Sequence, residues 1–278
     1  MTRDPQHPHA GDPRTAEELV ELVLADPESD EAGTALAVLH YRGGEAELAA
    51  GTRLVRSSDE DERIAGTNVL AQLGWGDRTM LDESVALLLE LLEDPSDSVV
   101  AAAAIALGHR GDDRGHAALI PLADHASEGV RFGVAWALSG VERADALQVL
   151  LRLSSDPDRD VRNWATFGVA QQCDLDTPEI RRVLHARLED EDGEVRGEAM
   201  LGLARRGDRA VLPFVHRELS DEILYCHAVE AAEHLADPSL HSLLVAQHES
   251  LEPDERARLE RFYVSALKAC RPPEAAAE

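Results

Sequence analysis

The chain has 278 residues and a mass of 30.2 kDa, enough for one elongated domain or for two ordinary ones. Apolar residues make up 44% of it and aromatic residues only 4%, which excludes a wholly disordered chain and predicts a core of Leu, Val and Ala. Because 54 acidic residues against 27 basic ones give a net charge of −27, nucleic acid and anionic membranes are poor partners, whereas a basic protein or peptide is attracted.

Both ends of the chain are polar and are predicted to be disordered tails, residues 1–14 and 271–278. The first of them has no apolar segment of the kind found in signal peptides, and no later stretch approaches 18 uninterrupted apolar residues, so neither secretion nor a membrane span is expected. The three cysteines form no CxxC pair, which is typical of a reducing compartment. We therefore expect a cytoplasmic protein whose residues 15–270 form a single domain.

Between the tails the sequence repeats with a period close to 31 residues. The clearest copy runs from Asp192 to Asp208 and has an acidic turn, an apolar anchor at Val195, and small or apolar residues four, seven and eight positions later. Seven segments share this pattern, with anchors at Glu31, Glu62, Val99, Val130, Val161, Val195 and Leu224. In a helix these offsets lie on one face, so each repeat is predicted to have one helix with a buried face.

The residue four positions after the anchor is small in almost every copy. Small side chains let neighbouring helices approach closely, so these positions are expected to be buried where helices cross. They include Gly66, Ala103, Ala165 and Ala199.

Each interval between these helices carries a second amphipathic segment, so each repeat is predicted to be a helical hairpin. In chain order the clearest of these segments are residues 82–92, 144–153, 178–188 and 212–219. A last helix, from about Pro253 to Cys270, is expected to cap the array. Because runs that alternate apolar and polar residues are missing, the predicted fold class is all-α, and the architecture is an α-solenoid of about seven hairpins.

The order Asp, Val-Arg, Ala, Ala-Leu, Gly-Asp within each repeat resembles the short bacterial HEAT-like repeat, which also occurs in phycobilin lyases and deoxyhypusine hydroxylase. The resemblance covers roughly residues 16–270. It implies an array that serves as a binding surface more often than as an enzyme. It also implies that the arginines after the anchors form a ladder of ion pairs between adjacent repeats; these are Arg63, Arg131, Arg162 and Arg196.

The active-site residues of those two enzymes are not recognisable here. Deoxyhypusine hydroxylase needs recurrent His-Glu pairs to hold two iron ions, and this chain has one such pair, at residues 248–249, outside the repeat pattern. His227, Glu230 and His234 share one helix face, but the ends of this set are about 10 Å apart along the axis, which a single ion rarely spans. We therefore assign no catalytic residue, no metal and no cofactor; a phycobilin-lyase-like chromophore-handling enzyme, or another HEAT-repeat enzyme, is the alternative.

A concave groove is expected opposite the packed helix face, at offsets two, five, six and nine from each anchor. Aromatic side chains concentrate in the middle of this groove, and acidic ones such as Glu230 and Glu233 follow toward its C-terminal end. Aromatic residues anchor many interfaces, although the same rings could simply pack between neighbouring helices. The predicted partner-binding residues are Phe132, Trp136, Asn163, Phe167 and Met200.

These observations predict a non-enzymatic scaffold, adaptor or inhibitor that binds a basic or amphipathic protein segment. The identity of the partner and the oligomeric state stay open. One further feature is the 37-residue interval between the second and third anchors, which adds about six residues near Trp75. Insertions in repeat arrays lie in loops, often beside a binding surface, so Trp75 either takes part in binding or caps its hairpin.

Overall fold

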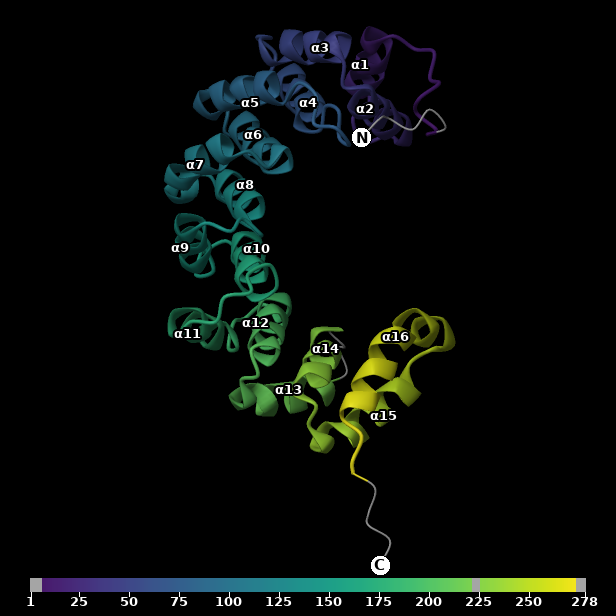
Figure 1. Ribbon diagram of the computed structural model, residues 1–278, viewed down its shortest axis with the longest axis vertical. Coiled ribbons are helices and arrows are strands. Elements are labelled where there is room, and N and C mark those ends of the chain that lie inside the picture. Colours follow the sequence, from purple (N-terminus) through teal and green to yellow (C-terminus); the bar gives the residue numbers. More distant parts are fainter. Residues whose placement is uncertain (1–6, 222–225, 274–278) are drawn as a thin grey trace, which may run out of the picture. The chain divides into compact units, whose positions relative to one another are not determined.

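A computed structural model describes residues 7–221 and 226–273 of the protein (Figure 1). Over these residues it has sixteen α-helices and no strand, which confirms the all-α prediction. The anchor predicted at Leu224 lies outside the described residues. None of the described helices combines the length and the apolar character needed to cross a membrane.

The helices group into two units, Met1–Val149 and Leu150–Glu278, and each is described by itself. The first unit holds α1 (Ala16–Ala25), α2 (Asp30–Arg42), α3 (Glu45–Val55), α4 (Glu60–Ala71), α5 (Leu81–Glu90), α6 (Asp97–Arg110), α7 (Asp113–Leu119) and α8 (Glu128–Leu138). Helix α9 (Ala144–Leu153) crosses the boundary. The second unit holds α10 (Arg159–Ala170), α11 (Pro178–Arg187), α12 (Gly193–Arg205), α13 (Leu212–Leu219), α14 (Cys226–Leu235), α15 (His241–Ser250) and α16 (Pro253–Ala269). That residues 15–270 form a single array stays a prediction.

Within each unit the helices pack as stacked hairpins. In the first unit α1 pairs with α2, α3 with α4, α5 with α6 and α7 with α8; in the second, α11 pairs with α12, α13 with α14 and α15 with α16. The even-numbered helices also pack on one another in sequence, α2 to α8 in the first unit and α10 to α16 in the second, and we call each such series an even-numbered row. This arrangement is that of an α-solenoid.

The predicted second segments of the hairpins correspond to α5, α9, α11 and α13, and the predicted C-terminal helix corresponds to α16. Helix α16 pairs with α15 and packs on α14, so it completes a further hairpin at the end of the second unit. The hairpin pattern read from the sequence is therefore confirmed at α5, α11, α13 and α16.

Small residues lie where the helices cross, as predicted. Gly66, Ala103, Ala165 and Ala199 are all buried. A Cβ atom at Gly66 would lie 2.7 Å from Cβ of Leu54 on α3, closer than real side chains approach. The close packing within the hairpin of α3 and α4 therefore requires the absence of a side chain at this position.

The apolar anchors Val99, Val130, Val161 and Val195 are buried, but the first two proposed anchors are not. Glu31 is exposed and Glu62 is half-buried, because an unpaired carboxylate is rarely placed in a core. In the first repeat the buried positions begin instead at Ala32.

The acidic turns of the repeat act as helix caps. The Asp158 side chain accepts hydrogen bonds from the backbone N–H of residues 160 and 161 at the start of α10, and Asp192 accepts equivalent bonds at the start of α12. At the other end, Gly43 and Gly111 adopt the left-handed conformation that ends α2 and α6. The recurrent Asp and Gly residues thus fix where each helix begins and ends.

Residues 7–14, the described part of the predicted N-terminal tail, lie against α2. The His7 ring stacks on Tyr41 with centroids 4.2 Å apart, and Arg42 donates hydrogen bonds to the carbonyl oxygens of Asp12 and Arg14. These contacts hold the segment at the first hairpin.

Candidate functional site

The arginine that follows each anchor ties its helix to the loop before it. In all four cases Nη1 donates to two backbone carbonyls, six and five residues earlier in the chain. Three of these arginines also pair with an acid farther along the chain, Arg63 with Asp94, Arg162 with Asp190 and Arg196 with Glu218. The ladder implied by the family resemblance is present at these three rungs.

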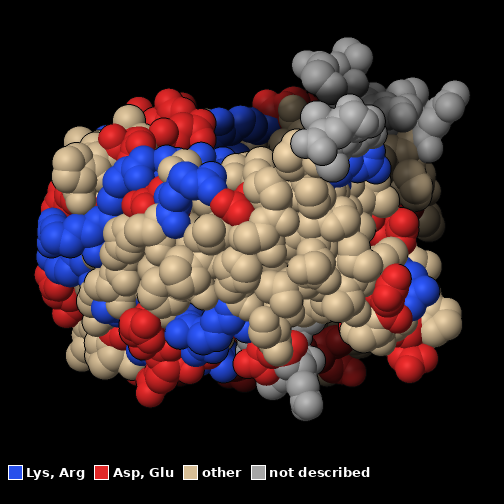
Figure 2. Space-filling view, turned by 90° about the horizontal axis from the view of Figure 1, so that it is seen from below, with Lys and Arg blue, Asp and Glu red and all other residues tan. Residues whose placement is uncertain are grey.

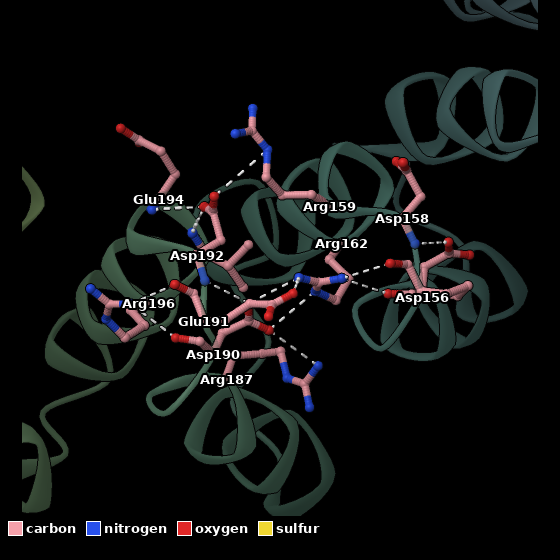
Figure 3. A network of polar contacts seen from close by, with 12 residues as sticks. Asp156, Asp158, Arg159, Arg162, Arg187, Asp190, Glu191, Asp192, Glu194 and Arg196 are labelled. Atoms are coloured by element: carbon pink, nitrogen blue, oxygen red, sulfur yellow. Dashed lines mark hydrogen bonds and ion pairs between the residues drawn. The ribbon is translucent and has the colours of Figure 1, made fainter.

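Figure 3 shows the rung at Arg162, on the loop edge of the second unit. Burial by itself would lower the pKa of Arg162, but the hydrogen bonds to Asp190 raise it above its usual value. A hollow of about 380 Å³ lies beside this pair and is lined largely by charged residues, including Arg187 and Glu191. Because Arg162 donates through Nε, Nη1 and Nη2 to protein acceptors, this network serves to join repeats.

The predicted partner-binding residues of the first unit, Phe132 and Trp136, are half-buried on α8. The Trp136 ring contacts the ring of His109, with centroids 4.6 Å apart. A Cβ atom at Gly108 would lie 2.8 Å from Cζ3 of Trp136, so the indole also packs on the backbone of α6. One side of this aromatic residue therefore packs between helices.

The other three predicted residues belong to the second unit. Asn163 and Phe167 are half-buried on α10, and the Phe167 ring meets Trp164 edge-on, with centroids 5.5 Å apart. The Oδ1 atom of Asn163 is buried and accepts no hydrogen bond from the described residues. Met200 is 2% exposed, where an accessible side chain was expected. The predicted set is thus divided between the two units, and its role in binding stays a prediction.

Met200 is one of a series of mispredicted positions. The residue five positions after the anchor is buried in every described repeat from the second onward, namely Thr67, Ala104, Ala135, Thr166 and Met200. The reason is that an even-numbered helix such as α12 packs on its hairpin partner α11 and also on the even-numbered helices α10 and α14. The exposed strip is therefore narrower than the arc left by hairpin packing alone. On α4, α6, α8 and α10 it includes offsets two and six, whereas on α12 the residues at these offsets, Gly197 and Leu201, are both buried.

A polar chain that the sequence analysis missed crosses the even-numbered row of the second unit. Gln171, the residue that caps the C-terminal end of α10, donates to Oε2 of Glu198 on α12 at 2.5 Å, and Oε1 of Glu198 lies 3.1 Å from Nε2 of His227 on α14. Glu198 is 7% exposed. A Cβ atom at Gly197 would lie 2.6 Å from Nδ1 of His227, so this glycine makes room for the imidazole ring. The sequence signal for this polar chain is Gly197 next to Glu198 on a helix face that packs against its neighbours.

More acidic side chains surround His227. Oε2 of Glu194 lies 3.9 Å from its Nδ1 atom, and the Glu194 side chain is largely exposed. Burial by itself would lower the pKa of His227, but the hydrogen bond to Glu198 and the charges of Glu194 and Glu230 raise it above the usual value. A protonated His227 neutralises part of this charge. Glu194 and Glu230 remain as two acids near the surface.

Helical spacing places the aromatic and acidic groups on one side of the row. Phe167 is one turn before Gln171, Glu194 is one turn before Glu198, and Glu230 is three residues after His227. We call these six residues the Glu198 face. In the part of the chain that the structure describes, no cluster of His, Cys, Asp or Glu has the geometry of a metal site, and His227 is engaged by Glu198.

The acidic excess of the chain is not spread as a uniform acidic surface. On the face of the molecule shown in Figure 2, basic and acidic side chains lie close together around an area of other residues. Local arrangements such as the Glu198 face, rather than the net charge alone, therefore decide where a cation is attracted.

Comparisons with known proteins agree with this fold. Residues 85–170 match the family of HEAT repeats. The Escherichia coli protein YibA is 37% identical over 114 residues, a segment that spans 41% of this chain and 40% of YibA. The X-ray structure of E. coli YibA matches with a TM-score of 0.69 at 26% identity over 91% of each chain. An engineered protein of known structure matches with a TM-score of 0.51 at 19% identity, over 92% of this chain and 78% of its own. Residues 85–170 are therefore similar to HEAT repeats, and the all-helical repeat fold of the chain is similar to that of YibA.

Proposed function

We propose that the protein is a non-enzymatic scaffold, adaptor or inhibitor that binds a basic segment of another protein on the Glu198 face. The observation that carries this proposal is the buried Glu198 carboxylate, which Gln171 and His227 hold in place between two more accessible acids. An array of helices with a fixed acidic strip suits an extended or helical ligand laid across the row.

The chemistry of the face favours a partner that carries arginine and an apolar group. A guanidinium binds carboxylates such as Glu194 and Glu230 through two parallel hydrogen bonds, whereas an ammonium offers a single point charge. Phe167 and Trp164 lie on α10 at the start of the same strip and offer aromatic surface to the apolar part of the segment. Phe132 and Trp136 remain proposed contacts in the first unit, and the burial of Met200 removes it from the proposed face.

The proposal is tested with a labelled amphipathic peptide that carries four arginines on one helical face, and with a second peptide in which glutamate replaces each arginine. We expect the first to bind the full chain saturably and the second not to bind. The double variant Glu194→Gln, Glu230→Gln should weaken binding of the basic peptide about tenfold, as expected for the loss of two charge-assisted contacts. Fluorescence anisotropy measures both.

The matched control is the double variant Glu21→Gln, Glu28→Gln, which removes two exposed acids of the first unit. It changes the net charge by the same amount and leaves the Glu198 face intact. Equal weakening by the two double variants would show that only the overall charge attracts the peptide, and the proposed face would then be wrong.

A further inference from the structure

A hollow in the first unit is formed by the loop between α4 and α5 and by the end of α6. Its charged side chains are basic, whereas the chain as a whole has an excess of acidic ones. Its volume is about 90 Å³, enough for several water molecules or for one carboxylate group. It is lined by Gln72, Gly74, Trp75, Arg78, His109 and Arg110. In a chain of net charge −27, two arginines and a histidine thus line a hollow whose lining includes no acid.

Arg110 is the central residue of this hollow. It is 3% exposed, and it donates from Nη1 to the Leu73 carbonyl at 2.8 Å and from Nη2 to the Thr79 carbonyl at 3.3 Å. Its Nε is buried and has no hydrogen-bond partner among the described residues. Burial lowers the pKa of Arg110, and the positive charge of Arg78 lowers it further. Since a guanidinium stays protonated in proteins, this is a buried cation without a counter-ion.

Arg206 occupies the same repeat position in the second unit, eleven residues after its anchor, and provides an internal comparison. All five of its N–H groups are matched by backbone carbonyls, those of Val169, Ala170, Cys173, Leu175 and Gly202. The repeat fold can therefore satisfy an arginine at this position completely. The incomplete bonding of Arg110 is specific to the hollow.

The inserted loop holds the second cation in place. Gly74, Arg78 and Met80 all have positive φ, at 59°, 54° and 52°, and a Cβ atom at Gly74 would lie 1.8 Å from Oγ1 of Thr79. Arg78 donates from Nη2 to the carbonyls of Arg110 and Gly111, where the partial negative charge at the end of α6 favours a cation. The loop conformation thus fixes the Arg78 side chain beside Arg110.

The acids near this loop already accept hydrogen bonds from other groups, although the pKa of Asp112, lowered mainly by the hydrogen bond from Arg114, is also lowered by the charge of Arg78. Asp112 accepts from Nε of Arg114 at 2.8 Å, and Asp77 accepts from the backbone N–H of Thr79 at 3.3 Å. Burial lowers the pKa of His109, so its ring is neutral at pH 7 and offers a hydrogen bond without a charge. The Trp75 side chain is 74% exposed and adds an apolar surface to the lining.

We infer that this hollow binds a carboxylate, which accepts hydrogen bonds from Arg110 and Arg78 while the apolar part of the ligand lies against Trp75. A carboxylate matches the donor geometry of guanidinium groups. It carries one charge, so the acidic field of the whole chain opposes its entry less than that of a doubly charged phosphate. The carboxylate comes either from a free small acid or from the C-terminus of a peptide.

The first test compares benzoate with benzamide, its neutral analogue of the same shape, by calorimetry on the full chain. Benzoate should bind saturably, whereas benzamide and inorganic phosphate should bind at least tenfold more weakly. Equal binding of benzoate and benzamide would overturn the inference.

The second test compares an N-acetylated tripeptide that has a free C-terminus with the same peptide that has an amidated C-terminus. If the free-acid tripeptide binds more tightly than benzoate, the source is a C-terminus; if benzoate binds more tightly, it is a small acid.

Variants assign the binding to the hollow. Arg78→Gln and Trp75→Ala should each weaken carboxylate binding at least tenfold with an unchanged helical circular dichroism spectrum, because both side chains are largely exposed. Arg56→Gln, which removes an exposed arginine elsewhere in the first unit, should leave it unchanged. No binding of either carboxylate at millimolar concentration, or wild-type binding by Arg78→Gln, would overturn the assignment.

Discussion

Arg162 and Asp190 join two adjacent repeats through two hydrogen bonds, 3.2 Å from Nε to Oδ2 and 3.1 Å from Nη2 to Oδ1, and their side chains are only 8% and 6% exposed. The residues are 28 positions apart in the chain. A buried bidentate pair of this kind fixes both the distance and the orientation of neighbouring helices, which a single apolar contact does not. Arg162 also pairs with the exposed side chain of Glu191, so a buried and an exposed ion pair can be compared at the same arginine.

Removing the acid of this pair should destabilise the second unit strongly. Asp190→Ala leaves the Arg162 charge buried without its main partner, so the free energy of unfolding should fall by about 3 kcal/mol. Glu191 also lies within 3.4 Å of Arg162, but its side chain is 89% exposed, so Glu191→Ala should cost less than about 0.5 kcal/mol. Urea denaturation followed by circular dichroism measures both, and equal losses for the two variants would contradict this account.

Helix crossing should depend on the missing side chain of Gly202. A Cβ atom there would lie 2.6 Å from Cβ of Ala170 on the adjacent helix, so Gly202→Ala should overpack the row and lower the free energy of unfolding by about 1 to 2 kcal/mol. At Gly33, within α2, a Cβ atom would meet nothing within 4 Å. Gly33→Ala should therefore stabilise the protein by about 0.5 to 1 kcal/mol through helix propensity. Thermal denaturation of the two variants should shift the midpoint in opposite directions.

The repeat pattern predicted the hairpins because it repeats the same local requirements. Caps such as Asp192, small residues such as Ala199 and apolar anchors such as Val195 act within one helix or between helices next to each other in sequence. The pattern did not predict that Met200 is buried, because the pattern divides the helical wheel only into a packed face and an exposed face, whereas α12 packs on three helices, α10, α11 and α14.

The two polar sites could not be predicted from spacing alone. The contact of Glu198 with His227 joins residues 29 positions apart, and their distance depends on how closely Gly197 lets α12 and α14 approach. The hollow at Arg110 depends on a loop in which Arg78 and Met80 adopt positive φ, a conformation for which neither residue type is a signal.

His40 should make the protein sensitive to acid. It is buried, with Nε2 2.8 Å from the Asn68 carbonyl, and burial, with smaller effects from His109 and Arg110, lowers its pKa from 6.5 to about 4. The unfolded chain therefore takes up a proton near pH 6.5 that the folded chain does not accept until about pH 4. The stability that His40 contributes is present above pH 6.5 and is lost as the pH falls toward 4, by about 2.5 kcal/mol between pH 7.5 and 4.5.

The variant His40→Gln tests this, because the amide can still donate to Asn68 but does not titrate. The free energy of unfolding of the wild type should fall more between pH 7.5 and 4.5 than that of the variant, by about 2.5 kcal/mol. Other titrating groups, including His227 with its raised pKa, are present in both proteins and cancel in this difference. Parallel pH profiles for the two proteins would refute the role of His40.

Aromatic and ionic contacts on the Glu198 face should affect different steps of partner binding. Phe167 makes short-range contacts that form only in the docked complex, so Phe167→Ala should speed dissociation of the arginine-bearing peptide and weaken its binding by about 2 kcal/mol. The acids act over a longer range, and raising the salt concentration from 50 to 500 mM should slow association while changing dissociation little. Phe214, on α13 beside Arg217, lies outside the face, so Phe214→Ala should leave both rates at wild-type values. Stopped-flow fluorescence with the labelled peptide separates the two rates.

Two outcomes of this experiment would contradict the proposal. If Phe214→Ala speeds dissociation as much as Phe167→Ala does, the aromatic contact proposed at α10 is wrong. If salt changes only the dissociation rate, the acids of the Glu198 face do not steer the encounter with the peptide.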